Sequence, residues 1–157
     1  MPIFLIDENA NHQPARTDSG AELVVLSDDL TPSEVGTELG LVADCWWLRG
    51  EFVSHPQDER WHRSRPYPHN GWKLASRLPK GEPAEKHLAD LLERIGPQAR
   101  RVSELASDPR IVSTRLWLVH RTDNENPGFS LSDWLLKRLV ALGAGLDVDV
   151  YVVPSVE

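Results

Sequence analysis

Residues 54–70 bring together four side chains of types that could bind a metal ion. They include His55, Asp58, His62 and His69. Imidazole nitrogens and carboxylate oxygens are ligands of zinc and other divalent ions. The spacing matches no metal-binding signature, however, and Arg60, Arg63 and Arg65 add positive charge to the same stretch. We therefore interpret it as a polar, solvated loop and predict neither a metal site nor a cofactor there.

The same stretch carries the residue types that dominate binding surfaces, namely Arg60, Trp61, Arg63, Arg65 and Tyr67. Tryptophan, tyrosine and arginine are enriched among the residues that supply most of the binding energy in protein interfaces. Arginine and tryptophan together can also hold an anion or stack on a planar ligand. The stretch is thus a candidate binding surface. The alternative is that its aromatic residues fold back and cover the core.

Two adjacent tryptophans, Trp46 and Trp47, belong to a strand-like stretch. Consecutive side chains of a strand point to opposite faces of the sheet. The two indoles must therefore have different surroundings, which leaves one of them to line a pocket or contact a partner. We add Trp47 to the candidate binding residues. Four tryptophans, Trp46, Trp72, Trp117 and Trp134, lie within predicted elements and are interpreted as core or sheet-face residues.

The rest of the sequence offers few residues that could be catalytic or bind a metal ion or phosphate. Asp147 and Asp149 lie on one face of the last predicted strand, where paired carboxylates could do acid–base work or hold Mg²⁺. We interpret them as an exposed strand face that charge keeps soluble. The single cysteine, Cys45, excludes an intrachain disulfide and a cysteine-based zinc site. The sequence has no phosphate-binding glycine motif and no Gly-x-Ser-x-Gly.

Hydrophobic periodicity predicts the elements that position these residues. Strands are predicted at residues 3–6, 21–27, 42–51, 71–78, 111–120 and 146–152, the first of them short. Helices are predicted at residues 32–39, 82–95, 98–107 and 133–142. Thr31 and Glu34 form a capping-box pattern before the first helix, and Ser132 caps the last. Gly40 and Gly143 are predicted to end these two helices.

The first and last helices each lie between two predicted strands, which indicates two β–α–β units of similar make. We therefore predict an α+β fold, with a single, mostly antiparallel sheet of about five strands, helices on one face and ferredoxin-like β–α–β units. The other sheet face is left partly open. Residues 1–20 are predicted to form an N-terminal arm or short extra strand, and residues 21–157 a single domain.

Composition limits the possible partners. The chain has 157 residues, of which 40% are hydrophobic and 26% charged, and a net charge of −7. This acidity disfavours binding to nucleic acid and to anionic membranes, and is compatible with a basic protein partner. The N-terminal residues lack the pattern of a secretory signal, and no stretch has the length of a membrane span. We therefore expect a cytoplasmic protein.

Three segments together resemble the domain of unknown function 4279 family. The first runs from Leu30-Thr31-Pro32-Ser33-Glu34-Val35 to Leu39-Gly40-Leu41, followed by Arg49-Gly50. The second is Gly71-Trp72-Lys73-Leu74-Ala75-Ser76, followed by His87-Leu88 and Leu91-Leu92. The third runs from Gly128-Phe129-Ser130-Leu131-Ser132 through Leu142-Gly143 to Leu146-Asp147-Val148-Asp149-Val150-Tyr151. The resemblance spans roughly residues 21–153. It implies a small bacterial α+β protein without an established activity, and it brings no catalytic residues.

Three hypotheses for function follow. The first is a non-catalytic protein-binding module, for which an inhibitor of the immunity or antitoxin type is one concrete form. The second is a small-ligand-binding regulatory module that uses Trp61, Arg63 and Tyr67 over the open sheet face. The third and least supported is an enzyme that uses Asp147, Asp149 or the histidines of residues 54–70. The predicted partner is another protein, or a second copy that forms a homodimer through the sheet.

Overall fold

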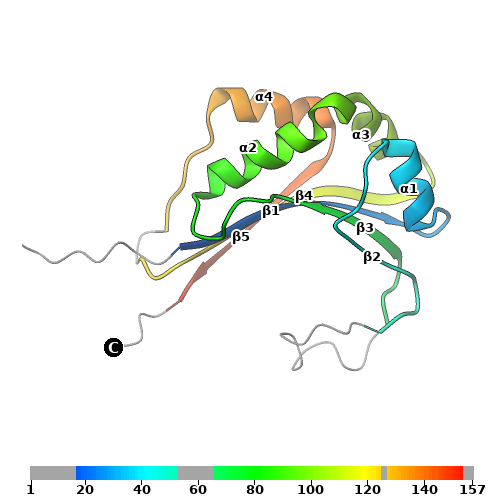
Figure 1. The fold of residues 1–157 in the computed structure, drawn as a ribbon, viewed down its shortest axis with the longest axis horizontal. Coiled ribbons are helices and arrows are strands. Elements are labelled where there is room, and N and C mark those ends of the chain that lie inside the picture. Colours follow the sequence, from blue (N-terminus) through cyan, green and yellow to red (C-terminus); the bar gives the residue numbers. More distant parts are fainter. Residues whose placement is uncertain (1–16, 53–65, 125–126, 154–157) are drawn as a thin grey trace, which may run out of the picture.

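Five strands and four α-helices make up the computed structural model, which describes residues 17–52, 66–124 and 127–153 (Figure 1). In chain order the elements are β1 (Thr17–Ser27), α1 (Pro32–Leu39), β2 (Cys45–Trp47), β3 (Asn70–Ala75), α2 (Ala84–Ile95), the 3₁₀ turn η1 (Gly96–Gln98), α3 (Ala99–Ala106), β4 (Ile111–Thr122), α4 (Asp133–Leu142) and β5 (Gly145–Val152).

The strands form one sheet in the order β2-β3-β1-β4-β5. The pairs β2–β3, β3–β1 and β1–β4 are antiparallel, and β4–β5 is parallel. The first four strands with their helices have the ferredoxin-like order. The α4 helix then connects β4 to a fifth strand beside it, which is an ordinary crossover between parallel strands. The predicted α+β class and mostly antiparallel sheet are confirmed.

All four helices cover the same face of the sheet (Figure 1). Alternate residues of the long strands point into this layer. The buried side chains of the sheet include Leu23, Val25, Trp72, Leu74, Leu116 and Leu118. The helices contribute Leu39, Leu88, Leu91, Ile95, Leu135 and Leu142. Burial of these apolar surfaces is the main force that holds the helices on the sheet.

Two ion pairs lie across the other face of the sheet. Lys73 Nζ lies 2.9 Å from Glu22 Oε1, which joins β3 to β1. Arg115 on β4 donates two hydrogen bonds to the Asp147 carboxylate on β5. Both pairs are partly exposed. This face is therefore uncovered in the described part of the chain, as the sequence predicts.

β2 is much shorter than the predicted strand of residues 42–51. Its last residue is followed by a turn, in which the Glu51 N–H donates to the Leu48 carbonyl at 3.1 Å, and residues 42–44 belong to the connection from α1. Gly50 has a φ of 86° in this turn, a conformation that favours glycine. β1 in contrast starts at Thr17 rather than at residue 21, and pairs with β4 along its whole length.

The predicted caps of the first and last helices are confirmed. The Thr31 N–H donates to Glu34 Oε2 at 2.7 Å, and the Glu34 N–H donates to Thr31 Oγ1 at 3.3 Å, which is a complete capping box. The Ser132 hydroxyl accepts from the Leu135 N–H. Gly40 and Gly143, with φ of 67° and 63°, end the two helices in the left-handed conformation.

Candidate functional site

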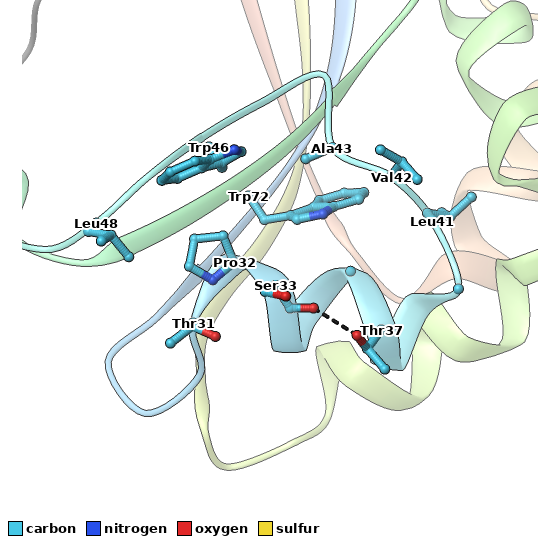
Figure 2. Close-up of a pocket in the computed structure, with 12 residues that line it drawn as sticks. Thr31, Pro32, Ser33, Thr37, Leu41, Val42, Ala43, Trp46, Leu48 and Trp72 are labelled. Atoms are coloured by element: carbon cyan, nitrogen blue, oxygen red, sulfur yellow. Dashed lines mark hydrogen bonds between the residues drawn. The ribbon is translucent and has the colours of Figure 1, made fainter.

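An apolar cavity of about 790 Å³ lies between α1, the connection from α1 to β2, and β2 itself (Figure 2). We call it the α1–β2 cavity. Its lining residues are Thr31, Pro32, Ser33, Gly36, Thr37, Gly40, Leu41, Val42, Ala43, Trp46, Leu48 and Trp72. Its size falls within the range of small-molecule and side-chain binding pockets, roughly 300–1,000 Å³.

The close approach of α1 to Trp72 forms the inner wall of the cavity. Gly36 makes it possible, because a Cβ atom there would lie 3.0 Å from the Leu41 carbonyl oxygen and 3.3 Å from Trp72 Nε1. The Leu41 N–H donates to the Gly36 carbonyl at 3.1 Å, which turns the chain from the end of α1 back along the helix. A larger residue at position 36 would push the helix and the indole apart.

Two tryptophans from neighbouring strands line the same cavity. Trp46 on β2 and Trp72 on β3 are partners in the antiparallel register, so their side chains lie on one face. Trp72 is 1% exposed and belongs to the core, whereas Trp46 is 58% exposed. Figure 2 shows both indoles above α1, with Pro32 below them. Trp46 therefore presents its indole to solvent at the mouth of the cavity.

The polar groups of the cavity are mostly used within α1. The Thr31 hydroxyl donates to Glu34 Oε2, and the Thr37 hydroxyl donates to the Ser33 carbonyl at 2.9 Å (Figure 2). The hydrogen bonds from Thr31 hold the pKa of the Glu34 carboxyl below its usual value. Among the described residues no ionisable side chain lines the cavity. The arrangement suits an apolar group and offers no acid or base.

Exposed apolar side chains occur before and after β2 in the sequence. β2 is the first strand in the sheet order, so its outer edge pairs with no strand among the described residues. Val42, at 86% exposure, flanks the cavity, and Phe52, at 62%, follows β2. Val42 and Trp46 both line the cavity, and exposed apolar side chains that lie together are typical of interaction surfaces.

Of the predicted binding residues, Trp47 and Tyr67 lie together. Their rings stack with centroids 4.9 Å apart and planes 24° apart. Trp47 lies over Gly71, where an added Cβ would be only 2.0 Å from the indole. Burial raises the pKa of the Tyr67 hydroxyl. The other four predicted residues, Arg60, Trp61, Arg63 and Arg65, lie outside the described residues.

The histidine group considered as a metal site is mostly outside the described residues too, since His55, Asp58 and His62 fall there. His69 Nδ1 is 2.8 Å from Asp28 Oδ1, and this hydrogen bond holds the pKa of the Asp28 carboxyl below its usual value. Within residues 17–52, 66–124 and 127–153, no group of three or more His, Cys, Asp or Glu side chains could hold a metal ion.

Two further residues from the sequence analysis lie on the last strand and the last helix, Asp147 on β5 and Trp134 on α4. On β5, the Asp147 carboxylate is bound by Arg115, which holds its pKa below the usual value. The interpretation of Trp134 as a core or sheet-face residue is wrong, because it lies on α4 and is 49% exposed. The buried face of α4 consists of Leu135, Leu139 and Leu142. Trp134 directly precedes Leu135 in the sequence and is not part of this face.

Sequence reasoning missed most of the α1–β2 cavity, because its lining comes from an ordinary helix and a short connection. One signal did point to it. Trp46 and Trp47 do face opposite sides of the sheet, but the sequence argument selected Trp47 as the binding candidate, whereas Trp46 lines the cavity and Trp47 stacks on Tyr67.

A comparison with models of protein families identifies the family of this chain. The model of a family described as a domain of unknown function, DUF4279, matches residues 16–153, which include every helix and strand of the structure. The chain belongs to this family. The resemblance seen in the sequence is thus confirmed. No curated protein and no solved structure matches the chain. Among the described residues of this DUF4279 chain, no helix combines the length and the hydropathy needed to cross a bilayer.

Proposed function

We propose that this DUF4279 chain is a protein-binding module whose α1–β2 cavity receives an apolar side chain from an extended segment of a partner protein. The observation that carries the proposal is the position of the cavity. An apolar pocket with an exposed tryptophan at its mouth lies beside the edge of β2 that pairs with no other strand in the described part of the chain.

The unpaired edge favours an extended segment as the occupant. A peptide that lies beside an edge strand satisfies its own backbone hydrogen bonds on that strand, and its side chains alternate between the two faces of the sheet. Trp46 and Trp72 lie on the helix-covered face at this edge. An added strand would therefore direct alternate side chains towards the α1–β2 cavity.

Apolar burial supplies the affinity. A side chain the size of leucine or phenylalanine contributes about 1.5–3 kcal/mol when it leaves water for an apolar site. The Trp46 indole would be covered by the same contact, and tryptophan is among the residues that most often dominate interface energies. Because the α1–β2 cavity is already formed in the described structure, little of this energy is spent on ordering it.

Charge indicates the kind of partner. The chain has a net charge of −7, so a basic partner would associate faster than an acidic one, at a rate that falls with added salt. A basic toxin that the chain inhibits, as immunity proteins and antitoxins do, has this chemistry. Electrostatic attraction would bring the partner close, and the apolar cavity would hold it.

The volume of the cavity supports a second function, a small-ligand-binding regulatory module. A cavity of about 790 Å³ with a mostly apolar lining could enclose a hydrophobic metabolite. A thermal-shift screen with apolar metabolites distinguishes the two functions. A ligand that raises the melting temperature of the wild type but not of Trp46→Ala supports the second.

The test of the proposed function compares Trp46→Ala with Trp134→Ala. Both residues are tryptophans about half exposed, but only Trp46 lines the cavity. Each protein is used to capture partners from a native lysate, and the affinity for the captured partner is then measured with purified components. We expect Trp46→Ala to weaken binding about tenfold or more and Trp134→Ala to leave it unchanged.

Two results would contradict the proposal. One is that wild type captures no stoichiometric partner. The other is that Trp46→Ala binds the partner as tightly as Trp134→Ala does, which would move the interface away from the cavity.

A further inference from the structure

A second cavity, of about 310 Å³, lies beneath the start of α2. It is lined by Thr17, Gly81, Pro83, Ala84, Glu85, His120, Gly128, Phe129 and Ser130. These residues come from the start of β1, the start of α2, the end of β4 and the connection from β4 to α4, which meet at one end of the sheet (Figure 1). The α1–β2 cavity shares none of these residues.

The start of α2 contributes backbone donors to this cavity. Its N-cap residue is Pro83, and no side chain caps the helix. The Pro83 carbonyl accepts from the N–H groups of Lys86 and His87, at 3.0 and 3.2 Å. The N–H groups of Ala84 and Glu85 have no partner within the helix, as expected of a first turn, and both residues line the cavity. A helix N-terminus with free donors attracts negative charge.

A buried histidine lines the same cavity. His120 is 8% exposed, and its Nδ1 lies 3.0 Å from the hydroxyl oxygen of Ser19, which is 3% exposed. In the tautomer in which the Ser19 hydroxyl donates to Nδ1, the ring hydrogen is on Nε2. Nε2 has no hydrogen-bond partner among the described residues. In that tautomer Nε2 is a donor on the cavity lining, which suits a ligand with acceptor atoms.

Among the residues that line the cavity, only Glu85 carries a negative charge, and its carboxylate forms a hydrogen bond with the start of α4. Its Oε1 accepts from the Ser132 N–H at 3.2 Å, at the start of α4. Ser132 also caps α4 with its hydroxyl, so the first turn of α4 is satisfied where that of α2 is not. Glu85 disfavours a highly charged anion and leaves room for a singly charged one.

We propose that this cavity binds a small oxyanion, a phosphate or carboxylate group. The N–H groups of Ala84 and Glu85, Nε2 of His120 and the Ser130 hydroxyl are its donors. At about 310 Å³ the cavity lies at the lower limit of ligand sites, roughly 300 Å³, which suits one anionic group with a short attached chain. The site is independent of the proposed protein-binding function.

The experiment is an NMR titration of the full chain, followed at backbone amides and at the histidine ring. Sodium phosphate and sodium acetate are the probes, and sodium chloride at matched ionic strength is the reference. We expect saturable shifts at the amides of Ala84 and Glu85 and at the ring of His120. The probe with the higher affinity identifies the chemical class. Shifts that are linear with concentration and equal to those in chloride would overturn the proposal.

Two variants test the assignment of the donors. His120→Gln removes the imidazole and should weaken binding about fivefold or more, whereas His69→Gln, at a histidine outside the cavity, should leave it unchanged. Glu85→Gln removes the negative charge and should tighten binding several-fold. Glu85 is partly exposed, so this variant should fold even where His120→Gln does not. Unchanged affinity in Glu85→Gln would overturn the proposed site.

Discussion

At the residue scale, the clearest feature is that neighbouring tryptophans have different roles. Trp46 is exposed at the mouth of the α1–β2 cavity, and Trp47 packs on Gly71 and Tyr67 on the other face of the sheet. The alternation of side chains along a strand is enough to separate them. What surrounds each indole depends on residues far along the chain.

Gly71 is the residue that makes room for Trp47. In Gly71→Ala, the new Cβ would overlap the indole, so Trp47 must leave its place on Tyr67. We expect the free energy of unfolding to fall by about 1–3 kcal/mol, the usual cost of overpacking. We also expect tryptophan fluorescence to shift to longer wavelengths as the indole becomes more exposed.

The matched control is Gly20→Ala on β1, where an added Cβ has no heavy atom within 4 Å. Chemical denaturation measures both variants. If Gly71→Ala and Gly20→Ala were equally stable, the Trp47 indole could move away from position 71 without lowering the free energy of unfolding, which would contradict the prediction.

At the element scale, Asp44 joins β2, β3 and α2. Its carboxylate accepts from the Ala75 N–H at 2.8 Å and from Arg94 at 2.7 Å. Arg94 also donates to the Ala75 carbonyl. The hydrogen bond from Arg94 is the main cause that holds the pKa of the Asp44 carboxyl below its usual 3.8. This contact positions the start of β2, and with it the outer wall of the α1–β2 cavity.

Asp44→Asn should therefore be less stable than wild type in a pH-dependent way. Because the pKa in the folded state is lowered, the stabilisation is complete above the unfolded pKa of about 3.8 and is lost as the pH falls through the lower folded pKa. We expect a difference of about 1 kcal/mol near neutral pH, since the pair is partly screened by solvent. The difference should shrink below about pH 4.

Urea denaturation across this pH range measures the effect, with Glu93→Gln on the exposed side of α2 as the control. A difference between Asp44→Asn and wild type that stays the same in acid would mean that the Asp44 charge does not stabilise the fold.

At the scale of the whole molecule, the uncovered face of the sheet is the place where a second copy would dock. Trp117 is 41% exposed there and lies between Glu22 and Asp147 in the register. The ion pairs of these two residues, with Lys73 and Arg115, flank the indole. An aromatic centre with a charged rim is the usual composition of an interface.

A homodimer through the sheet stays a prediction, and Trp117 allows its test. We expect wild type to sediment with twice the 17.7 kDa mass of the chain and Trp117→Lys with the single mass, because the substitution places a charge at the centre of the interface. Trp134→Lys on α4 serves as the control and should remain dimeric. Sedimentation of wild type as a monomer would contradict the prediction.

The sequence by itself determined the fold class, the family and most of the elements, but not the bounds of β1 and β2. Capping at Thr31 and Ser132, the glycine ends of two helices and the alternation of β5 depend on interactions within a few residues, so they can be seen in the sequence. The open sheet face follows from the β–α–β pattern, because the helices of such units cover the same side.

Only the tertiary structure decided where the two cavities lie. The α1–β2 cavity depends on the pairing of Trp46 with Trp72 and on the approach of α1 at Gly36. The smaller cavity depends on the start of α2 reaching His120, near the end of β4. These contacts join segments separated by tens of residues, so their geometry is set by strand order, register and packing. Local periodicity, capping and turn signals carry no information about such distances.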